Sequence, residues 1–200
     1  MISTLLSIDR HLFLFFNSAI ANPVFDVLFP YITEVETWVI PALVLMVVFY
    51  RKEGRRAGYI LLLAVVLVSI TDPVCVHILK PWFHRLRPCA PTEIIPGARY
   101  LIGTRSSYSF PSAHAMNIFA QAALFSLAYR KKWIYFMGFA VLIGFSRIYV
   151  GVHYPLDVIG GAMIGCFCGG ALYFLSRSFA RSPMAAYLGL PVRPLFQEKR

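Results

Sequence analysis

Long apolar segments separated by short polar joints run through the sequence. Four of them are clear and cover residues 59–79, 113–129, 133–150 and 156–175. Each is close to the roughly 20 residues that a helix needs to cross the hydrocarbon core of a bilayer. A fifth segment, about 30–50, carries Glu34 and Glu36 near its start, and we place these acids at the headgroup level. The pattern predicts an all-α integral membrane bundle of five transmembrane helices.

The N-terminal segment, residues 2–20, is also apolar, but Asp9, Arg10 and His11 interrupt it near its middle. This favours an amphipathic helix that lies at the membrane interface, and a sixth span is the alternative. We therefore expect an interfacial helix over residues 1–23, a membrane domain over 24–176 and a cytoplasmic tail over 177–200.

Composition supports the membrane class. Hydrophobic residues make up 58% of the 200 residues, charged residues only 14%, and the mean hydropathy is +0.67. A soluble domain of this size has too little interior to bury so many apolar side chains. The cysteines fit neither a disulfide framework nor a zinc-ligand pattern, and no cofactor is expected.

The formal net charge of +10 raises the question of nucleic-acid binding. Most of the Lys and Arg residues, however, lie in the joints 51–56 and 130–132 and in the tail 177–200, which is the pattern of membrane orientation. The bias predicts a multi-pass protein of the bacterial inner membrane with these joints in the cytoplasm, and no nucleic-acid partner. Six basic residues then lie on the opposite, periplasmic side, against the bias: Lys80, Arg85, Arg87, Arg99, Arg105 and Arg147.

One polar stretch, residues 147–157, joins the last two apolar segments and carries Arg147, His153 and Asp157. Ionisable groups are costly near hydrocarbon, so three together indicate a site. Pro155 suits the first turn of a helix, which would bring Asp157 close enough to accept a ring N–H of His153. The other ring nitrogen would then be free to attack or to carry a proton.

Two further polar stretches fall at the same end of the predicted bundle. Residues 80–88 follow the second span with Lys80 and Arg87, and residues 109–114 open the third span with Ser112 and His114. Arginine forks and a lysine ammonium bind phosphate oxygens, and a helix start offers free N–H groups to an anion. Two histidines supply a nucleophile and a proton donor for ester cleavage, and the cations can replace a metal ion. The pattern predicts metal-independent cleavage of a phosphate ester.

These stretches resemble the motifs of the type 2 phosphatidic acid phosphatase family: Lys-x6-Arg-Pro, then Pro-Ser-Gly-His, then Ser-Arg-x5-His-x3-Asp. The resemblance covers roughly residues 24–175. It implies that His153 forms a phosphohistidine, that Asp157 orients it, and that His114 protonates the leaving group and then activates water. The residues implied to hold the phosphate are Lys80, Arg87, Ser112, Ala113 and Arg147.

One position departs from the family pattern. Ala113 replaces the usual Gly, and its backbone N–H remains usable if the residue is helical. Family members of this size act on lipid phosphates or diphosphates on the outer leaflet, which include undecaprenyl diphosphate, phosphatidylglycerophosphate and lipid A. The resemblance implies such a substrate, acted on from the periplasmic face, without choosing among these lipids or giving an oligomeric state.

The loop 89–110 lies over the mouth of the predicted site. It is either a simple connector or a headgroup contact in which Arg99 and Arg105 hold a second phosphate. Arg85 occupies no defining motif position and is expected to contact headgroups. Gly161, Gly165 and Gly169, spaced every fourth residue, favour close helix packing.

Two other functions stay open from sequence. A vanadium-dependent haloperoxidase-like enzyme would hold vanadate in a similar site, and bromide oxidation would distinguish it. A non-catalytic lipid-phosphate binding or transport protein would keep the pocket without turnover, although the presence of His114, His153 and Asp157 argues against that role.

Overall fold

The computed structural model describes residues 2–92 and 94–182, which fold entirely into helices and connecting loops without a strand. Three short elements are π- or 3-10 helices: η1 (Phe15–Ala19), η2 (Val74–Leu79) and η3 (Arg130–Lys132). The α-helices are α1 (Ile2–Leu14), α2 (Pro23–Thr33), α3 (Glu36–Glu53), α4 (Arg55–Pro73), α5 (Lys80–Phe83), α6 (Ala113–Ala128), α7 (Trp133–Tyr149) and α8 (Pro155–Arg181). The predicted all-α class is confirmed.

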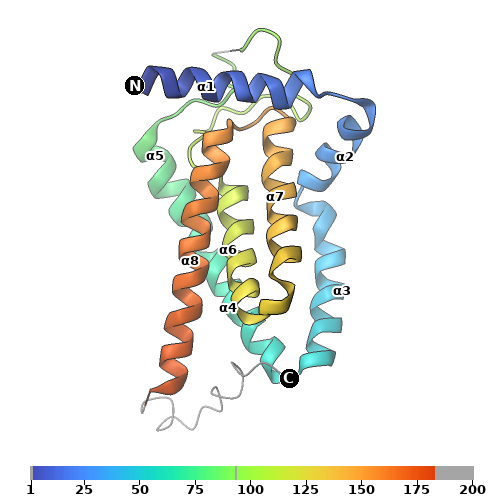
Figure 1. Cartoon of the computed structure of the whole chain (residues 1–200), viewed down its shortest axis with the longest axis vertical. Helices are drawn as coiled ribbons and strands as arrows, with labels where there is room; N and C mark the ends of the chain where they lie inside the picture. The colour runs from blue at the N-terminus through green and yellow to red at the C-terminus, as the bar shows by residue number, and fades with distance from the viewer. Residues whose placement is uncertain (1, 93, 183–200) are drawn as a thin grey trace.

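The long helices α3, α4, α6, α7 and α8 run side by side along the long axis of the molecule, and α1 lies across one end of them (Figure 1). A bend of 113° separates the N-terminal helix from α2. The N-terminal segment therefore crosses the end of the bundle instead of extending it, and its place at the membrane interface stays a prediction.

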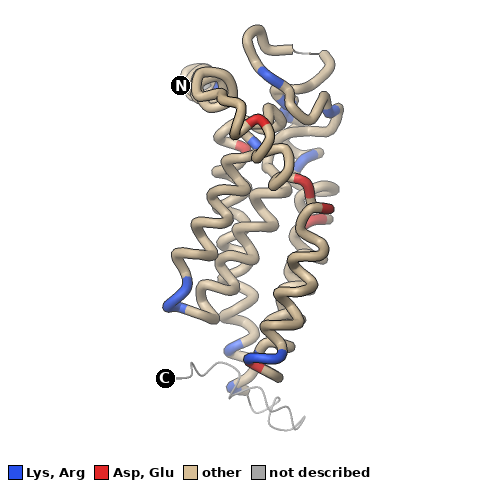
Figure 2. Tube along the Cα trace, turned by 90° about the vertical axis from the view of Figure 1, so that its right-hand side faces the viewer, with Lys and Arg blue, Asp and Glu red and all other residues tan. Residues whose placement is uncertain are grey.

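Lipid-facing character is evident in the exposed side chains and the distribution of charge. Large apolar residues on the outer faces are strongly exposed, for example Phe167 at 75% and Ile40 at 73%. Figure 2 shows Lys and Arg gathered towards the two ends of the bundle, with a mostly uncharged middle. Such an exterior is stable in contact with hydrocarbon and unfavourable in water.

Two helices of the described part are long and apolar enough to cross a membrane by length and composition: Arg55–Phe83, which joins α4, η2 and α5, and Pro155–Arg181. The N-terminal helix with α2 would add a third if that bent pair forms one span. The helices α3, α6 and α7 have 18, 16 and 17 residues, at the short end for a span. The integral membrane bundle is confirmed, and the count of five spans stays a prediction.

Two element boundaries differ from the sequence prediction. The segment 30–50 is not one helix, because α2 ends at Thr33, Glu34 adopts an extended backbone, and α3 begins at Glu36. At the other end of the chain, α8 continues to Arg181, so the expected tail 177–200 begins inside a helix. Residues 183–200 of that tail lie outside the described residues.

The small-residue stripe on α8 packs directly against the backbone of α6. A Cβ added to Gly165 would lie 2.2 Å from the carbonyl oxygen of Met116, and one added to Gly169 would lie 2.2 Å from that of Ala120. Only glycine allows this approach, so the predicted packing role is confirmed. The contact fixes the start of α8 beside the start of α6, and both starts carry residues of the predicted site.

Candidate active site

The three polar stretches identified from sequence meet at the end of the bundle that α1 crosses (Figure 1). The backbone N–H of Ser112, before α6, donates to the carbonyl oxygen of Asp157, in the first turn of α8, at 3.0 Å. From the loop after α5, Arg87 Nη1 lies 3.1 Å from Nε2 of His153. The structure thus gathers residues that are up to 77 positions apart into one buried cluster.

His153 lies in the tight turn between α7 and α8 and is only 1% exposed. Gly151 makes this turn possible, because its φ is +90° and a Cβ there would lie 2.2 Å from the carbonyl oxygen of Arg99. The N–H of His153 donates to the carbonyl oxygen of Arg147 at 3.3 Å, which fixes the backbone of the turn to the end of α7.

The contacts of the His153 ring define which nitrogen carries the hydrogen. Arginine can only donate, so the contact from Arg87 requires an unprotonated Nε2. The hydrogen of the neutral ring therefore lies on Nδ1, which faces the Ser109 hydroxyl at 3.3 Å and Oδ2 of Asp157 at 3.5 Å. This tautomer leaves the lone pair of Nε2 directed towards the cationic side of the site.

Burial and nearby positive charge hold the pKa of His153 well below its usual range. Burial is the larger cause, followed by repulsion from Arg87 and Arg147. Loss of hydration disfavours the imidazolium, and so do the neighbouring cations. His153 is therefore neutral at physiological pH, which is the protonation state that a nucleophile needs.

Asp157 is fully buried and holds several donors. Its Oδ2 accepts from the backbone N–H of Tyr154 at 2.8 Å and from the Ser109 hydroxyl, and its Oδ1 accepts from Arg85 Nη1 at 2.7 Å. The Ser109 hydroxyl thus lies between the two partners predicted from sequence, as it donates to Asp157 and faces Nδ1 of His153.

Arg85 bridges two buried carboxylates. Besides Asp157, it pairs with Asp9 of α1, where Nη2 and Oδ2 are 2.5 Å apart, and its guanidinium lies 4.3 Å from the ring centre of Tyr154. The other oxygen of Asp9 accepts from the N–H of Leu156 at 2.9 Å. The expected headgroup role of Arg85 is therefore corrected, because its charge is committed inside the protein.

Three cations line the other side of His153. Arg87 uses Nε to bind the carbonyl oxygen of Ser107 at 3.0 Å, and Arg147 uses Nη1 to bind the Thr33 hydroxyl at 2.6 Å. In the described part of the chain, the buried Nε of Arg147 has no hydrogen-bond partner. Lys80, at the start of α5, is 6% exposed. Its positive charge and those of the two arginines disfavour protonation of His153. These donors form a site for a polyanion.

The start of α6 supplies neutral donors beside the cations. Ser112 is the N-cap residue, and its hydroxyl accepts from the N–H of Ala115 at 3.4 Å. The next two amides, of Ala113 and His114, belong to the first turn, where helical N–H groups lack an intrahelical acceptor. Ala113 is helical without a positive φ, so the replacement of glycine keeps its N–H in place.

The two loop arginines differ in their contacts. The guanidinium of Arg99 is in an ion pair with Asp26, and its backbone N–H donates to Oδ1 of Asn17 at 2.7 Å. This differs from the expected headgroup contact, because Arg99 joins the loop to the N-terminal helices. Arg105 is exposed and contributes to the positive potential at His114.

Sequence reasoning missed three residues of this cluster: Ser109, Arg85 and Asp9. Ser109 lies two residues before the second motif, and Arg85 lies inside the first, so both had a positional signal. The signal for Asp9 was its charge, because an acidic residue in an apolar helix needs a partner of opposite charge.

Known proteins resemble this chain over most of its length. Residues 56–180 match the family model described as the PAP2 superfamily. The chain is similar to the lipid A 4'-phosphatase of Bacteroides thetaiotaomicron, with 32% identity over 88% of this chain and 80% of the relative. A second lipid A 4'-phosphatase, from Porphyromonas gingivalis, is 31% identical over 94% of this chain and 85% of its own length.

Among solved structures, a PAP2-type phosphatidylglycerolphosphate phosphatase from Bacillus subtilis superposes with a TM-score of 0.62. Its sequence is 28% identical, and the alignment covers 88% of this chain and 86% of that one. The similarity thus includes the bundle as well as the motif-bearing loops.

Proposed function

The chain belongs to the PAP2 superfamily and is a membrane enzyme that hydrolyses lipid phosphates, and we propose that it does so through a phosphohistidine on Nε2 of His153. The single observation that carries this proposal is the contact from Arg87 to Nε2, which requires the lone pair on that nitrogen. A neutral ring with a defined tautomer is prepared to attack phosphorus without a prior proton transfer.

Substrate binding would place the phosphate between the cations and the start of α6. The oxygens would accept from Lys80, Arg87 and Arg147, and from the first amides of α6. As a phosphate oxygen takes the donor of Arg87, the lone pair of Nε2 is released. The anion itself therefore uncovers the nucleophile.

In the first step, the Nε2 lone pair forms a P–N bond as the bond from phosphorus to the lipid oxygen breaks. His114, which takes up a proton from water once the bound phosphate offsets the surrounding cations, donates that proton to the leaving oxygen. The cations and the amides of α6 stabilise the charge spread over the three remaining oxygens.

In the second step, a water molecule attacks phosphorus and gives a proton to His114. The electron pair of the P–N bond returns to Nε2, inorganic phosphate leaves, and the histidines regain their starting states. His114 thus acts first as an acid and then as a base, His153 first as the nucleophile and then as the leaving group, and the cations can replace a metal ion throughout.

During attack, positive charge builds on the His153 ring, and its Nδ1 hydrogen faces the Ser109–Asp157 pair. The Asp157 carboxylate stabilises that charge through the Ser109 hydroxyl and directly at 3.5 Å. We assign Ser109, Arg85 and Asp9 as positioning residues, since they act on the ring through Asp157.

We propose a phosphate monoester on a lipid A-type headgroup as the substrate, which the two named relatives support. The ion pair between Arg99 and Asp26 favours a monoester over a diphosphate, because only Arg105 of the two loop arginines is left for a second phosphate. Phosphatidylglycerophosphate is the second candidate, supported by the structural relative.

We further propose that the site faces the periplasm across a bacterial inner membrane. Basic residues crowd the opposite end of the bundle, in the joint between α3 and α4 and in η3. Under the positive-inside rule this end lies in the cytoplasm.

The test is phosphate release by purified protein from lipid A, phosphatidylglycerophosphate and undecaprenyl diphosphate. The expected result is fastest release from lipid A, a rate unchanged by a chelator, and no release by a folded His153→Ala variant. Full turnover by that variant would overturn the mechanism, and strong inhibition by the chelator would overturn metal independence.

A further inference from the structure

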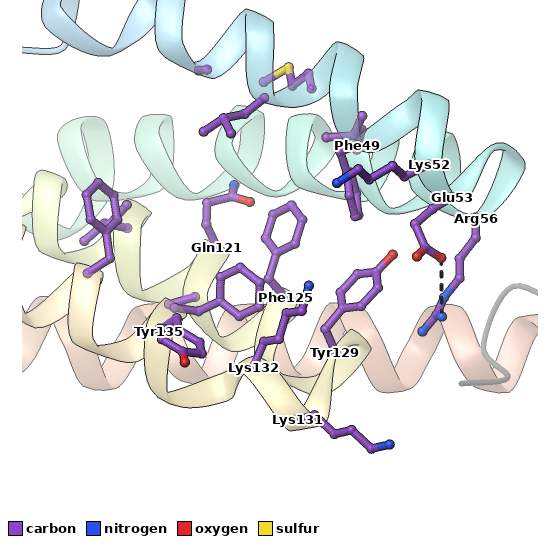
Figure 3. A pocket seen from close by; sticks show the side chains of 18 residues that line it. Phe49, Lys52, Glu53, Arg56, Gln121, Phe125, Tyr129, Lys131, Lys132 and Tyr135 are labelled. Carbon is purple, nitrogen blue, oxygen red and sulfur yellow. Dashed lines mark ion pairs between the residues drawn. The ribbon is translucent and has the colours of Figure 1, made fainter. Parts of the chain in front are cut away.

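A cavity of about 800 Å³ lies between α3, α4, α6 and α7 (Figure 3). Its lining reaches the end of α3 and η3, at the other end of the bundle from His153. Its size falls within the roughly 300–1,000 Å³ of ligand pockets. Its walls are mainly apolar and include Leu45, Met46, Ile118, Phe125, Phe136 and Phe139. The catalytic cycle described above does not use this cavity.

Aromatic contacts hold α3 away from the rest of the bundle. Near one end of α3, the ring of Trp38 contacts Phe139 at 5.0 Å, and near the other end Phe49 contacts Tyr129 at 5.4 Å. Between these contacts the small side chains of Ala42 and Ala122 line the cavity. The aromatic spacers therefore leave an apolar slot at membrane depth.

Positive charge borders the slot where the bundle ends. The exposed side chains of Lys52 and Lys132 reach over the space between Phe49, Phe125 and Tyr129, whereas Lys131 points away from it (Figure 3). Long lysine side chains at helix ends commonly direct their amines to the level of lipid headgroups. The slot is thus apolar inside and cationic at its mouth.

The remaining charges at the mouth are Glu53 and Arg56, which neutralise each other in an ion pair at 3.8 Å. Arg56 also donates to the carbonyl oxygen of Ala128 at 2.8 Å and lies 4.6 Å from the ring centre of Tyr129. These contacts close the slot on one side and leave the charges of Lys52 and Lys132 for an external anion.

Several buried polar atoms of the slot lining lack a hydrogen-bond partner among the described residues, and they include Gln121 Oε1 and the Tyr129 hydroxyl. Within residues 2–92 and 94–182, the Tyr129 hydroxyl has no hydrogen-bond partner, and its oxygen is shielded from solvent. A buried hydroxyl without a partner is unfavourable by about 1–3 kcal/mol. Tyr129 follows α6 at the same end of the bundle as Lys132, and its hydroxyl points towards Glu53 and Arg56 (Figure 3).

From these features we infer that the slot binds an anionic glycerophospholipid from the leaflet opposite the catalytic site. Its phosphate contacts Lys52 and Lys132, an ester carbonyl accepts from Tyr129, and an acyl chain lies between α3 and α6. The apolar walls need an acyl chain, so free phosphate alone does not fill the site. The ammonium groups of Lys52 and Lys132 form no ion pair with a described residue, and they favour a net negative headgroup over a zwitterionic one.

Native mass spectrometry of the full chain in detergent tests this inference, with phosphatidylglycerol and phosphatidylcholine of the same acyl chains as probes. We expect tighter binding of phosphatidylglycerol, weakened about fivefold by Lys132→Ala and about 25-fold when Lys52→Ala is added. Lys131→Ala is the matched control and should change the affinity by less than twofold. Tyr129→Phe should weaken both lipids.

Several outcomes would overturn the inference: equal affinity for the two lipids, equal effects of Lys131→Ala and Lys132→Ala, or displacement of phosphatidylglycerol by millimolar inorganic phosphate. Loss of binding in His153→Ala would assign the lipid to the catalytic site instead. Because lipid binding is the readout, failure here leaves the proposed phosphatase activity intact.

Discussion

The hydroxyl of Ser109 lies 3.3 Å from Nδ1 of His153, closer to it than either carboxylate oxygen of its predicted partner. Asp157 Oδ2 is 3.5 Å from Nδ1 and accepts a hydrogen bond from the Ser109 hydroxyl, so the serine links the His153 ring to the Asp157 carboxylate. A histidine oriented by a hydroxyl and a carboxylate together is held more tightly than by a single long contact.

Replacement of Ser109 by alanine is expected to lower kcat by about 10- to 100-fold, since small misplacement of a reacting group has effects of this size. KM should change little, because the phosphate donors stay in place. Steady-state phosphate release measures both constants. The control is Ser106→Ala, at an exposed position in the same loop. A kcat within twofold of wild type would show that Ser109 does not position His153.

Arg85→Met is expected to destabilise the protein by about 3–5 kcal/mol, because Asp9 and Asp157 would both lose their cation in a buried site. Thermal unfolding in detergent measures the effect. Adding Asp9→Asn to this variant should recover part of the loss, as it removes one uncompensated charge. The exposed neighbour Arg10 provides the control Arg10→Met. Unfolding of Arg85→Met at the wild-type temperature would contradict the bridging role.

The sequence predicted the motif residues because their spacing follows local geometry. Pro155 begins α8, so Asp157 falls near His153, and Ser112 begins α6, so its amides face the same space. Arg85 was misjudged because its partners are 72 and 76 residues away in the chain, and no local pattern encodes such a contact.

The same limit applies to the helices. Apolar runs identified the long helices, including the stripe of Gly161, Gly165 and Gly169 that packs on α6. The division between α2 and α3 was missed because a helix break at Glu34 depends on how the N-terminal helices pack over the bundle end. Hydropathy averages over such a break.

The lowered pKa of His153 predicts a pH dependence of stability. In the unfolded chain a histidine takes up a proton below about pH 6.5, whereas the buried ring stays neutral. The unfolded state then binds more protons, so stability falls as pH decreases. From pH 7.5 to 5.5 this histidine should account for about 1.4 kcal/mol, measured as the difference between wild type and His153→Gln. An identical pH profile for both would contradict a neutral buried ring.

The close approach of α6 and α8 predicts sensitivity to a single methyl group. In Gly165→Ala the new Cβ would clash with the carbonyl oxygen of Met116, with an expected cost of about 1–3 kcal/mol. Separation of the two helix starts should also lower kcat. Gly170→Ala is the matched control, because nothing lies within 4 Å of its added Cβ. Equal unfolding temperatures for the two variants would contradict the packing argument.

The central claim is that phosphate passes through Nε2 of His153. The most direct measurement is rapid mixing of purified enzyme with 32P-labelled lipid phosphate, an alkaline quench that preserves phosphohistidine, and mapping of the protein-bound label by mass spectrometry. We predict label on His153, bonded through Nε2, and none in His153→Ala. Label on another residue, or an undiminished yield of label in His153→Ala, would contradict the mechanism.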